Sequence, residues 1–140
     1  MSLMPAQMDR KIEEQFGFEA ADNVEAVLST LAPDAVHDIV GWPAGPTQGR
    51  DGARPVYEAL FADLADGRVT SRKRLYGGSF LIDESLWEGR APGCPFGLEG
   101  RGRPLKFRLL HVIEFTAGGD IQREQVWVDM AAILQQLPQH

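Results

Sequence analysis

The last third of the chain, residues 104–137, reads PLKFRLLHVIEFTAGGDIQREQVWVDMAAILQQL. This pattern predicts two long strands joined by a glycine-containing turn and followed by a short helix. Strand residues two apart share a face, so one face of the first strand carries Leu105, Phe107, Leu109, His111, Ile113 and Phe115. The same alternation places Trp127 and Asp129 together on one face of the second strand. An imidazole and a carboxylate on the apolar side of a sheet are costly unless they are paired, so this hairpin is where we look for chemistry.

The length of 140 residues indicates one domain with a sizeable core. We expect that domain to span residues 9–137, and residues 1–8 to be disordered or derived from expression. No segment reaches the roughly 20 apolar residues that span a bilayer, and the N-terminus lacks a signal-type apolar core. The single cysteine, Cys94, excludes an intramolecular disulfide. Together these features predict a cytoplasmic protein with no membrane partner.

The formal net charge of −6 argues against nucleic acid as a partner. The three histidines, His37, His111 and His140, have none of the close spacings that zinc sites use. No glycine-rich phosphate loop and no nucleophilic Ser or Cys motif is visible. We therefore expect no metal and no cofactor, and any chemistry would be acid–base work by side chains.

Helical patterns occupy the first half of the chain, at residues 9–16, 19–31 and from Asp51, a plausible N-cap, to Gly67, a plausible C-cap. A short strand is expected at 35–40, and residues 41–52 read as a loop. Strands are expected at 69–76 and 79–91, before the irregular segment 90–104 and the final hairpin. This order predicts an α+β fold in which helices pack on one face of a curved antiparallel sheet. The interior of such a cone is a natural apolar pocket.

Several motifs resemble the SnoaL-like polyketide cyclase branch of the NTF2-like (cystatin-like) superfamily. They are Trp42-Pro43, Gly49-Arg50-Asp51-Gly52, Asp83-Glu84, Trp87-Glu88-Gly89, Gly119-Asp120-Ile121, Trp127, Asp129 and Gln136-Leu137. The resemblance covers roughly residues 9 to 137 and implies an NTF2-like cone with a curved sheet wrapped around N-terminal helices. In that branch the last strand carries a pocket Asp eight residues after the turn Ile, and Asp129 has that spacing from Ile121.

Asp129 is accordingly the first candidate for a catalytic residue, because an apolar pocket would raise its pKa. The alternative is that Asp129 only caps the terminal helix, residues 130–137. His111 is the second catalytic candidate, as a proton shuttle or as a partner that orients the carboxylate; the alternative is a core histidine bonded to a backbone carbonyl. His37 is a candidate substrate-binding residue, but the pattern does not decide whether His37 or Asp38 faces inward.

Large amphipathic aromatic residues suit the lining of a cone that holds a flat, hydrophobic ligand. The candidates for substrate binding are Trp42, Tyr57, Tyr76, Trp87 and Trp127. Ordinary packing in the core or against a second subunit is the alternative for each of them.

Two functional hypotheses follow. The first is a cofactor-independent enzyme that moves a proton on a hydrophobic carbonyl substrate, as a cyclase, isomerase or dehydratase. The second is a non-catalytic ligand-binding or dimerisation module. An open cavity reached by Asp129 and His111 favours the enzyme, and a filled cavity with Asp129 as a cap favours the module. An epoxide hydrolase would need an Asp-Arg-Asp relay in the pocket, and Arg108 has the wrong strand parity for it.

The outward row of the last hairpin is also apolar, with Leu110, Val112, Val126 and Val128 assigned to it by strand alternation. A sheet that is apolar on both faces needs a second cover. We therefore expect a homodimer packed sheet to sheet.

Overall fold

The computed structural model describes residues 2–43 and 45–137. Two helices, α1 (Pro5–Ala20) and α2 (Val24–Ser29), precede strand β1 (Leu31–Val40) and the short strand β2 (Thr47–Gln48). Helix α3 (Gly49–Asp63) leads into β3 (Ala65–Tyr76) and β4 (Phe80–Ala91). A 3₁₀ turn, η1 (Pro95–Gly97), precedes β5 (Arg103–Phe115), β6 (Ile121–Val128) and helix α4 (Met130–Gln136). The predicted α+β class is confirmed.

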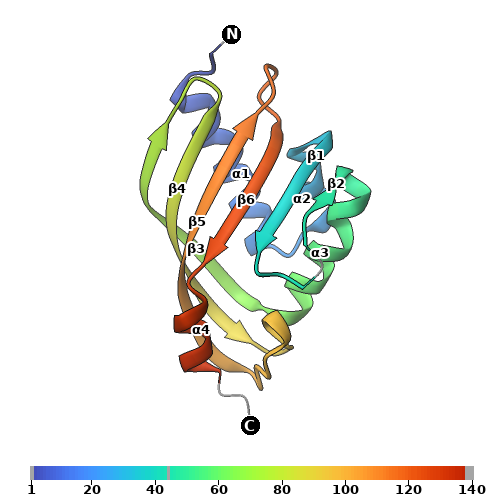
Figure 1. The fold of residues 1–140 in the computed structure, drawn as a ribbon, viewed down its shortest axis with the longest axis vertical. Helices are drawn as coiled ribbons and strands as arrows, with labels where there is room; N and C mark the ends of the chain where they lie inside the picture. The colour runs from blue at the N-terminus through green and yellow to red at the C-terminus, as the bar shows by residue number, and fades with distance from the viewer. Residues whose placement is uncertain (1, 44, 138–140) are drawn as a thin grey trace.

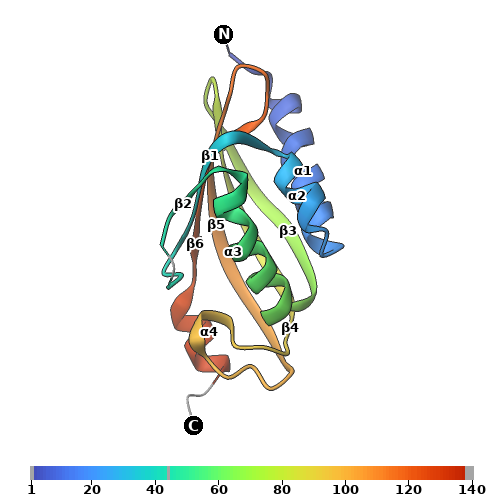
Figure 2. The same ribbon diagram turned by 90° about the vertical axis from the view of Figure 1, so that its right-hand side faces the viewer.

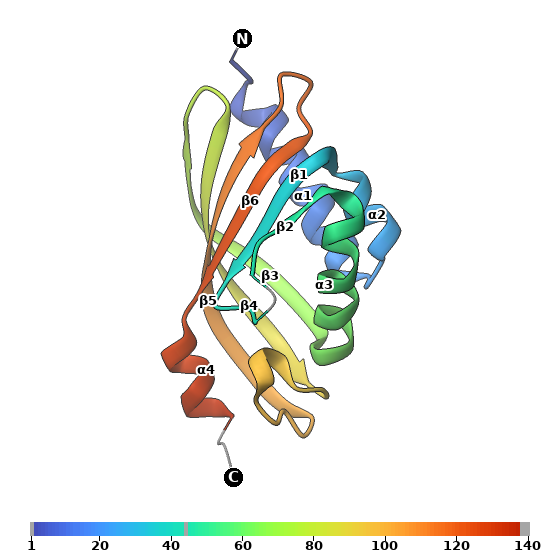
Figure 3. The same cartoon turned by 45° about the vertical axis from the view of Figure 1, so that its right-hand side comes forward.

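One six-stranded sheet has the order β2-β1-β6-β5-β4-β3. Its neighbouring strands are antiparallel except for β1 and β6, which run parallel. Helices α1, α2 and α3 cover one side of the curved sheet, and α4 lies at the end opposite the N-terminus (Figures 1 and 2). Figure 3 shows the strands bending around the helical side, which produces the concave face expected for the cone.

Strand β5 has the predicted inward row. All six of its residues from Leu105 to Phe115 at odd positions are buried, and Lys106, Arg108 and Glu114 are exposed. This alternation is the period of two that a sheet with one covered face requires.

Strand β6 departs from simple alternation because of a β-bulge. Ile121 pairs with Phe115, whereas Arg123 pairs with Glu114, so Gln122 is an extra residue with no partner of its own on β5. A bulge of this kind moves the following side chains to the opposite face. Glu124 (1% exposed) consequently lies on the inner side and Trp127 (49% exposed) on the outer side.

This bulge corrects two predictions. Trp127 and Asp129 do not share the face of His111, and the outward row of the hairpin does not contain Val126 and Val128. Val126 pairs with His111 and Val128 with Leu109, both on the inner face, while Leu110 pairs with the outward Trp127.

Several expected element boundaries also differ. Helix α1 is continuous from Pro5, and Met8 is fully buried, so residues 5–8 belong to the folded unit rather than to a disordered extension. Helix α3 begins after Gln48 and ends before Leu64, so neither Asp51 nor Gly67 is its cap. Gly67 instead lies inside β3, where a Cβ atom would meet the indole of Trp87.

Candidate functional site

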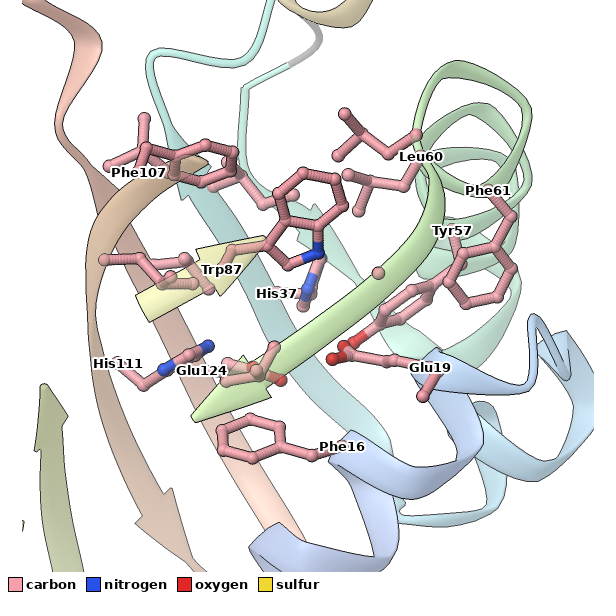
Figure 4. Close-up of a pocket in the computed structure, with 18 of the residues that line it drawn as sticks. Phe16, Glu19, His37, Tyr57, Leu60, Phe61, Trp87, Phe107, His111 and Glu124 are labelled. Atoms are coloured by element: carbon pink, nitrogen blue, oxygen red, sulfur yellow. The ribbon is translucent and has the colours of Figure 1, made fainter. Parts of the chain in front are cut away.

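A cavity of about 100 Å³ lies between the concave face of the sheet and helices α1 and α3. Its apolar walls come mainly from aromatic side chains, and the close-up in Figure 4 shows Phe16, Phe61, Trp87 and Phe107 around it. Its polar lining consists of Glu19, Asp22, His37, Tyr57, His111 and Glu124. A mostly apolar pocket with a few inward polar groups is typical of a site for a small hydrophobic ligand.

His37 faces this cavity, which settles the choice between His37 and Asp38. The side chain is 3% exposed and packs against the ring of Tyr57, with centroids 4.7 Å apart. Its Nδ1 atom is buried and has no hydrogen-bond partner among the described residues. Burial lowers the pKa of His37, and the carboxylates of Glu124 and Asp38 offset that effect only in part. The imidazole is therefore held in its neutral form.

His111 also faces the cavity, and Asp83 of β4 is its paired neighbour in the sheet. His111 Nδ1 lies 3.5 Å from Asp83 Oδ1, which is within ion-pair distance, but like His37 Nδ1 it is buried without a hydrogen-bond partner among the described residues. Phe16 of α1 packs against the imidazole ring, and the centroids of the two rings are 5.0 Å apart. The arrangement directs Nδ1 at a carboxylate and leaves Nε2 at the opposite edge of the ring.

Asp83 is fully buried and held by several donors. Ser71 Oγ donates to Oδ2 at 2.6 Å, Arg74 Nε donates to the same oxygen at 2.8 Å, and Ser85 donates to Oδ1. Burial alone would raise the pKa of Asp83, but the adjacent His111 and the hydrogen bonds from Ser71, Ser85 and Arg74 outweigh it and lower that pKa well below the ordinary value. Asp83 is thus a permanent negative charge beside His111.

A second cluster of polar side chains lies where α1 and α3 face β6 across the cavity. Gln15 Nε2 donates to Glu124 Oε1 at 2.7 Å and lies 3.4 Å from the hydroxyl oxygen of Tyr57. Burial and the charge of Glu124 raise the pKa of Glu19 well above its usual range. Burial and the same carboxylates raise the pKa of Tyr57, so its hydroxyl stays protonated.

Four of the eight predicted site residues line this cavity: His37, Tyr57, Trp87 and His111. The other four lie elsewhere. Trp42 packs edge-on against Phe96 with centroids 5.2 Å apart, and the hydroxyl of Tyr76 donates to Asp9 at 2.7 Å on the surface. Trp127 is on the outer face of the sheet because of the bulge.

Asp129 also lies outside the cavity. Its Oδ1 accepts a hydrogen bond from the backbone N–H of Ala132 at 3.2 Å, and it is the N-cap of α4. It borders a shallow depression on the outer side of the sheet together with Arg108 and Trp127. The eight-residue spacing from Ile121 would place Asp129 on the inner face only if side chains alternated without interruption along β6. The bulge at Gln122 interrupts that alternation.

Four acidic residues in or beside the cavity were not predicted from the sequence: Glu19, Asp22, Asp83 and Glu124. The inward direction of Asp83 could have been predicted, because it occupies the same alternate positions of β4 as Leu81, Ser85 and Trp87. The inward direction of Glu124 could not have been predicted from the sequence, since it depends on how β6 pairs with β5. Glu19 reaches the cavity from the last turn of α1. The sequence pattern instead predicts that one helix ends at residue 16 and another begins at residue 19.

An Asp-Arg-Asp cluster does occur, but it lies outside the cavity. Arg74 Nη1 is 2.8 Å from Asp9 Oδ1, and its Nε is 2.8 Å from Asp83 Oδ2. Neither Arg74 nor Asp9 lines the cavity, and no Arg or Lys does so among the described residues. The cluster therefore supports His111 indirectly rather than meeting a ligand.

No group of three His, Cys, Asp or Glu side chains in residues 2–43 and 45–137 is arranged to hold a metal ion. Within the same residues, no helix is both long and apolar enough to cross a bilayer.

The curved sheet, its helical cover and the internal cavity define an NTF2-like fold. A family model, the SnoaL-like polyketide cyclase, matches residues 8–137. The chain belongs to this family, which confirms the resemblance found in its sequence motifs. No curated protein matches the chain in sequence.

Solved structures share the fold at low sequence identity. TsrD from Streptomyces laurentii has a TM-score of 0.84 and 18% identity, with 99% of each chain covered. An NTF2-like protein from Burkholderia pseudomallei has a TM-score of 0.78 and 17% identity, covering 94% of this chain and 98% of that one. SalBIII, an epoxide hydrolase/cyclase-like enzyme in pyran ring formation of salinomycin, has a TM-score of 0.75 and 16% identity, covering 91% and 94%.

Proposed function

We propose that this protein is a cofactor-independent enzyme that moves a proton on a hydrophobic carbonyl substrate, as a cyclase, isomerase or dehydratase does. One observation carries the proposal: His111 faces an apolar cavity while its Nδ1 points at Asp83, which is held ionised. Membership of the SnoaL-like family supports the same kind of enzyme.

His111 acts as the general base in this proposal. A carboxylate next to Nδ1 favours the tautomer with the proton on that atom, which leaves Nε2 free to accept a proton. A substrate with a carbonyl group would lose a proton from the adjacent carbon to Nε2. Aldol closure, double-bond migration and dehydration can all begin from the resulting enolate.

Tyr57 is the donor proposed for the enolate oxygen, to which its hydroxyl would turn from Glu124. Its raised pKa keeps the hydroxyl protonated, and its ring lies against His37 on the cavity wall. A neutral donor in a site shielded from water interacts with a developing negative charge more strongly than water does. Trp87 and Phe107, stacked with centroids 5.3 Å apart, would support the apolar part of the substrate.

The alternative is a non-catalytic binding module. The position of Asp129, which caps α4 and does not line the cavity, favours this alternative. The two hypotheses differ in whether the cavity accelerates proton transfer. A suitable probe is 2-tetralone, a cyclic ketone whose α-protons exchange with D₂O at a rate that NMR measures.

We expect wild-type protein to accelerate this exchange, and His111→Gln to slow the catalysed rate by about 100-fold or more, the range typical of a lost general base. Asp129→Asn serves as the comparison because it changes a carboxylate outside the cavity. Binding of 2-tetralone without acceleration would favour the binding module, and equal rates for wild type and His111→Gln would remove His111 from the mechanism.

We also propose that the outer face of the sheet pairs two copies of the chain. Large exposed apolar side chains gather there, including Leu110 on β5 and Trp127 on β6, which are direct cross-strand partners. Leu75 and Phe80 add to the exposed apolar surface on β3 and β4. A second sheet would cover these groups and remove them from water.

A further inference from the structure

The acidic residues that line the cavity have no basic counterpart there among the described residues. Three acidic residues line it, Glu19, Asp22 and Glu124, and no Lys or Arg does so within the described part of the chain. His37 does not reverse this balance, since its burial holds it neutral. A carboxylate or phosphate ligand would enter against this field without a cationic partner.

Hydrogen-bond acceptors converge inside the cavity from three elements. Glu19 comes from α1, His37 from β1 and Glu124 from β6, and Figure 4 shows these side chains directed into the same space. Glu124 has one oxygen occupied by Gln15, and His37 Nδ1 is buried without a partner in the described residues. A buried nitrogen of this kind is costly unless a ligand supplies the missing bond. With its proton on Nε2, His37 would need a donor at Nδ1.

Aromatic rings surround these acceptors. Phe16, Tyr57, Phe61 and Trp87 all line the cavity, and the rings of Tyr57 and Phe61 are 6.0 Å apart. Aromatic faces attract cations when water is excluded, and Trp does so most strongly. Carboxylates and aromatic faces together form an environment suited to a positively charged nitrogen.

We propose that the substrate carries a protonated primary amine, and that its ammonium group lies between Glu19, Glu124 and His37. This assignment rests on the proposed function only in placing the substrate in this cavity, since the ammonium site is separate from the proton acceptor, His111. The N–H groups donate to the two carboxylates and to His37 Nδ1, and the hydrophobic part of the ligand contacts the aromatic wall.

Proton linkage supports this assignment. Glu19 interacts electrostatically with Glu124 from β6 and with Tyr57 from α3. The other titratable groups of the cavity lining are Asp22, His37 from β1 and His111 from β5. Burial and Glu124 raise the pKa of Glu19, so the empty site favours its protonated form. An ammonium ion favours the ionised form instead. Binding of the amine should therefore release a proton from Glu19.

A matched set of ligands tests the charge preference: 2-naphthylmethylammonium, 2-naphthalenemethanol and 2-naphthoate, which share one ring system. Isothermal titration calorimetry at pH 7 should show the amine binding at least 10-fold more tightly than the alcohol, and no detectable binding of naphthoate. Repeating the amine titration in phosphate and Tris, which differ in ionisation enthalpy, should reveal release of up to one proton.

Glu19→Gln and Glu124→Gln should each reduce the preference for amine over alcohol by 5-fold or more, and Glu19→Gln should abolish the proton release. Glu14→Gln, on the exposed side of the same helix, is the control for the loss of one negative charge and should leave the preference unchanged. If a variant fails to fold, the wild-type ligand series and proton release still decide the question.

Equal or tighter binding of the alcohol would overturn the ammonium assignment, as would binding of naphthoate or failure of the amine to bind at millimolar concentration. Such a result would leave the proposed proton transfer intact if 2-tetralone exchange still depends on His111. Conversely, preferential amine binding without catalysed exchange would retain the ammonium site and remove the enzyme proposal.

Discussion

The imidazole of His111 and the carboxylate of Asp83 face each other from paired positions of β5 and β4, with Nδ1 and Oδ1 3.5 Å apart. This pairing connects the cavity to a buried charge that three side chains of β3 and β4 hold in place. Asp83 does not line the cavity, so it is a positioning residue for His111 rather than a group that touches the substrate.

Asp83→Asn should therefore lower kcat for 2-tetralone exchange by about 10- to 100-fold, within the range of general-base effects, and leave KM nearly unchanged. An amide in place of the carboxylate weakens the preference for the tautomer with a free Nε2. Steady-state kinetics on the folded variant would measure kcat and KM separately and so check this prediction. A rise in KM with constant kcat would instead indicate that Asp83 only shapes the cavity.

Asp83 should also make the stability of the protein depend on pH. Its pKa is lowered by folding, so its contribution is present above the ordinary Asp pKa of about 3.9 and is lost as the pH falls through and below that value. Removing one partner of a buried ion pair costs about 3 kcal/mol or more. Urea unfolding of wild type and Asp83→Asn should show that difference at pH 7.

The same comparison at lower pH provides the control. The difference between the two free energies of unfolding should shrink as the pH falls below about 4, because the wild-type carboxyl becomes protonated on unfolding. A difference that stays constant down to pH 3 would show that packing, and not the charge of Asp83, is responsible.

Asp129 should matter for helix α4 and not for catalysis. Asn retains the side-chain oxygen that accepts the bond from Ala132, so Asp129→Asn should change the free energy of unfolding by less than about 0.5 kcal/mol, whereas Asp129→Ala should cost about 1 kcal/mol. Both variants should keep wild-type turnover. Loss of exchange activity in a fully folded Asp129→Asn would return Asp129 to the role of base that the sequence motif suggests.

Gly67 should control the position of Trp87. A Cβ atom at Gly67 would lie 2.8 Å from Trp87 Nε1, so Gly67→Ala should push the indole into the cavity. We expect a loss of about 1–3 kcal/mol in stability, as for other overpacked sites, and weaker binding of 2-tetralone in calorimetry.

Two further variants test that explanation. Gly118→Ala, in the exposed turn before β6, has no neighbour closer than 3.8 Å and should have little effect. Adding Trp87→Leu to Gly67→Ala should recover part of the lost stability, because the clash is removed. If the double variant shows only the sum of the two single effects, the glycine acts through the backbone instead.

The proposed dimer predicts a change in mass. Wild-type protein should elute as a dimer at micromolar concentration in size-exclusion chromatography with light scattering, and Leu110→Glu should shift it to the monomer, because the charge would be buried opposite Trp127. Glu14→Gln, on the helical side, should leave the dimer intact. A wild-type monomer under these conditions would contradict sheet-to-sheet pairing.

The sequence alone determined the α+β class, the family and the inward row of β5, because a period of two and the residues of a turn are local properties of the chain. It also predicted that His111 faces inward, since the strand around it alternates without interruption. The direction of β6 was decided only by tertiary structure. Where the extra residue of the bulge falls depends on how β6 pairs with β5, and that single residue places Glu124 in the cavity and Asp129 outside it. The partnership of Asp83 with His111, and the approach of Glu19 from a helix far away in the chain, likewise depend on the register and packing of elements that no local pattern encodes.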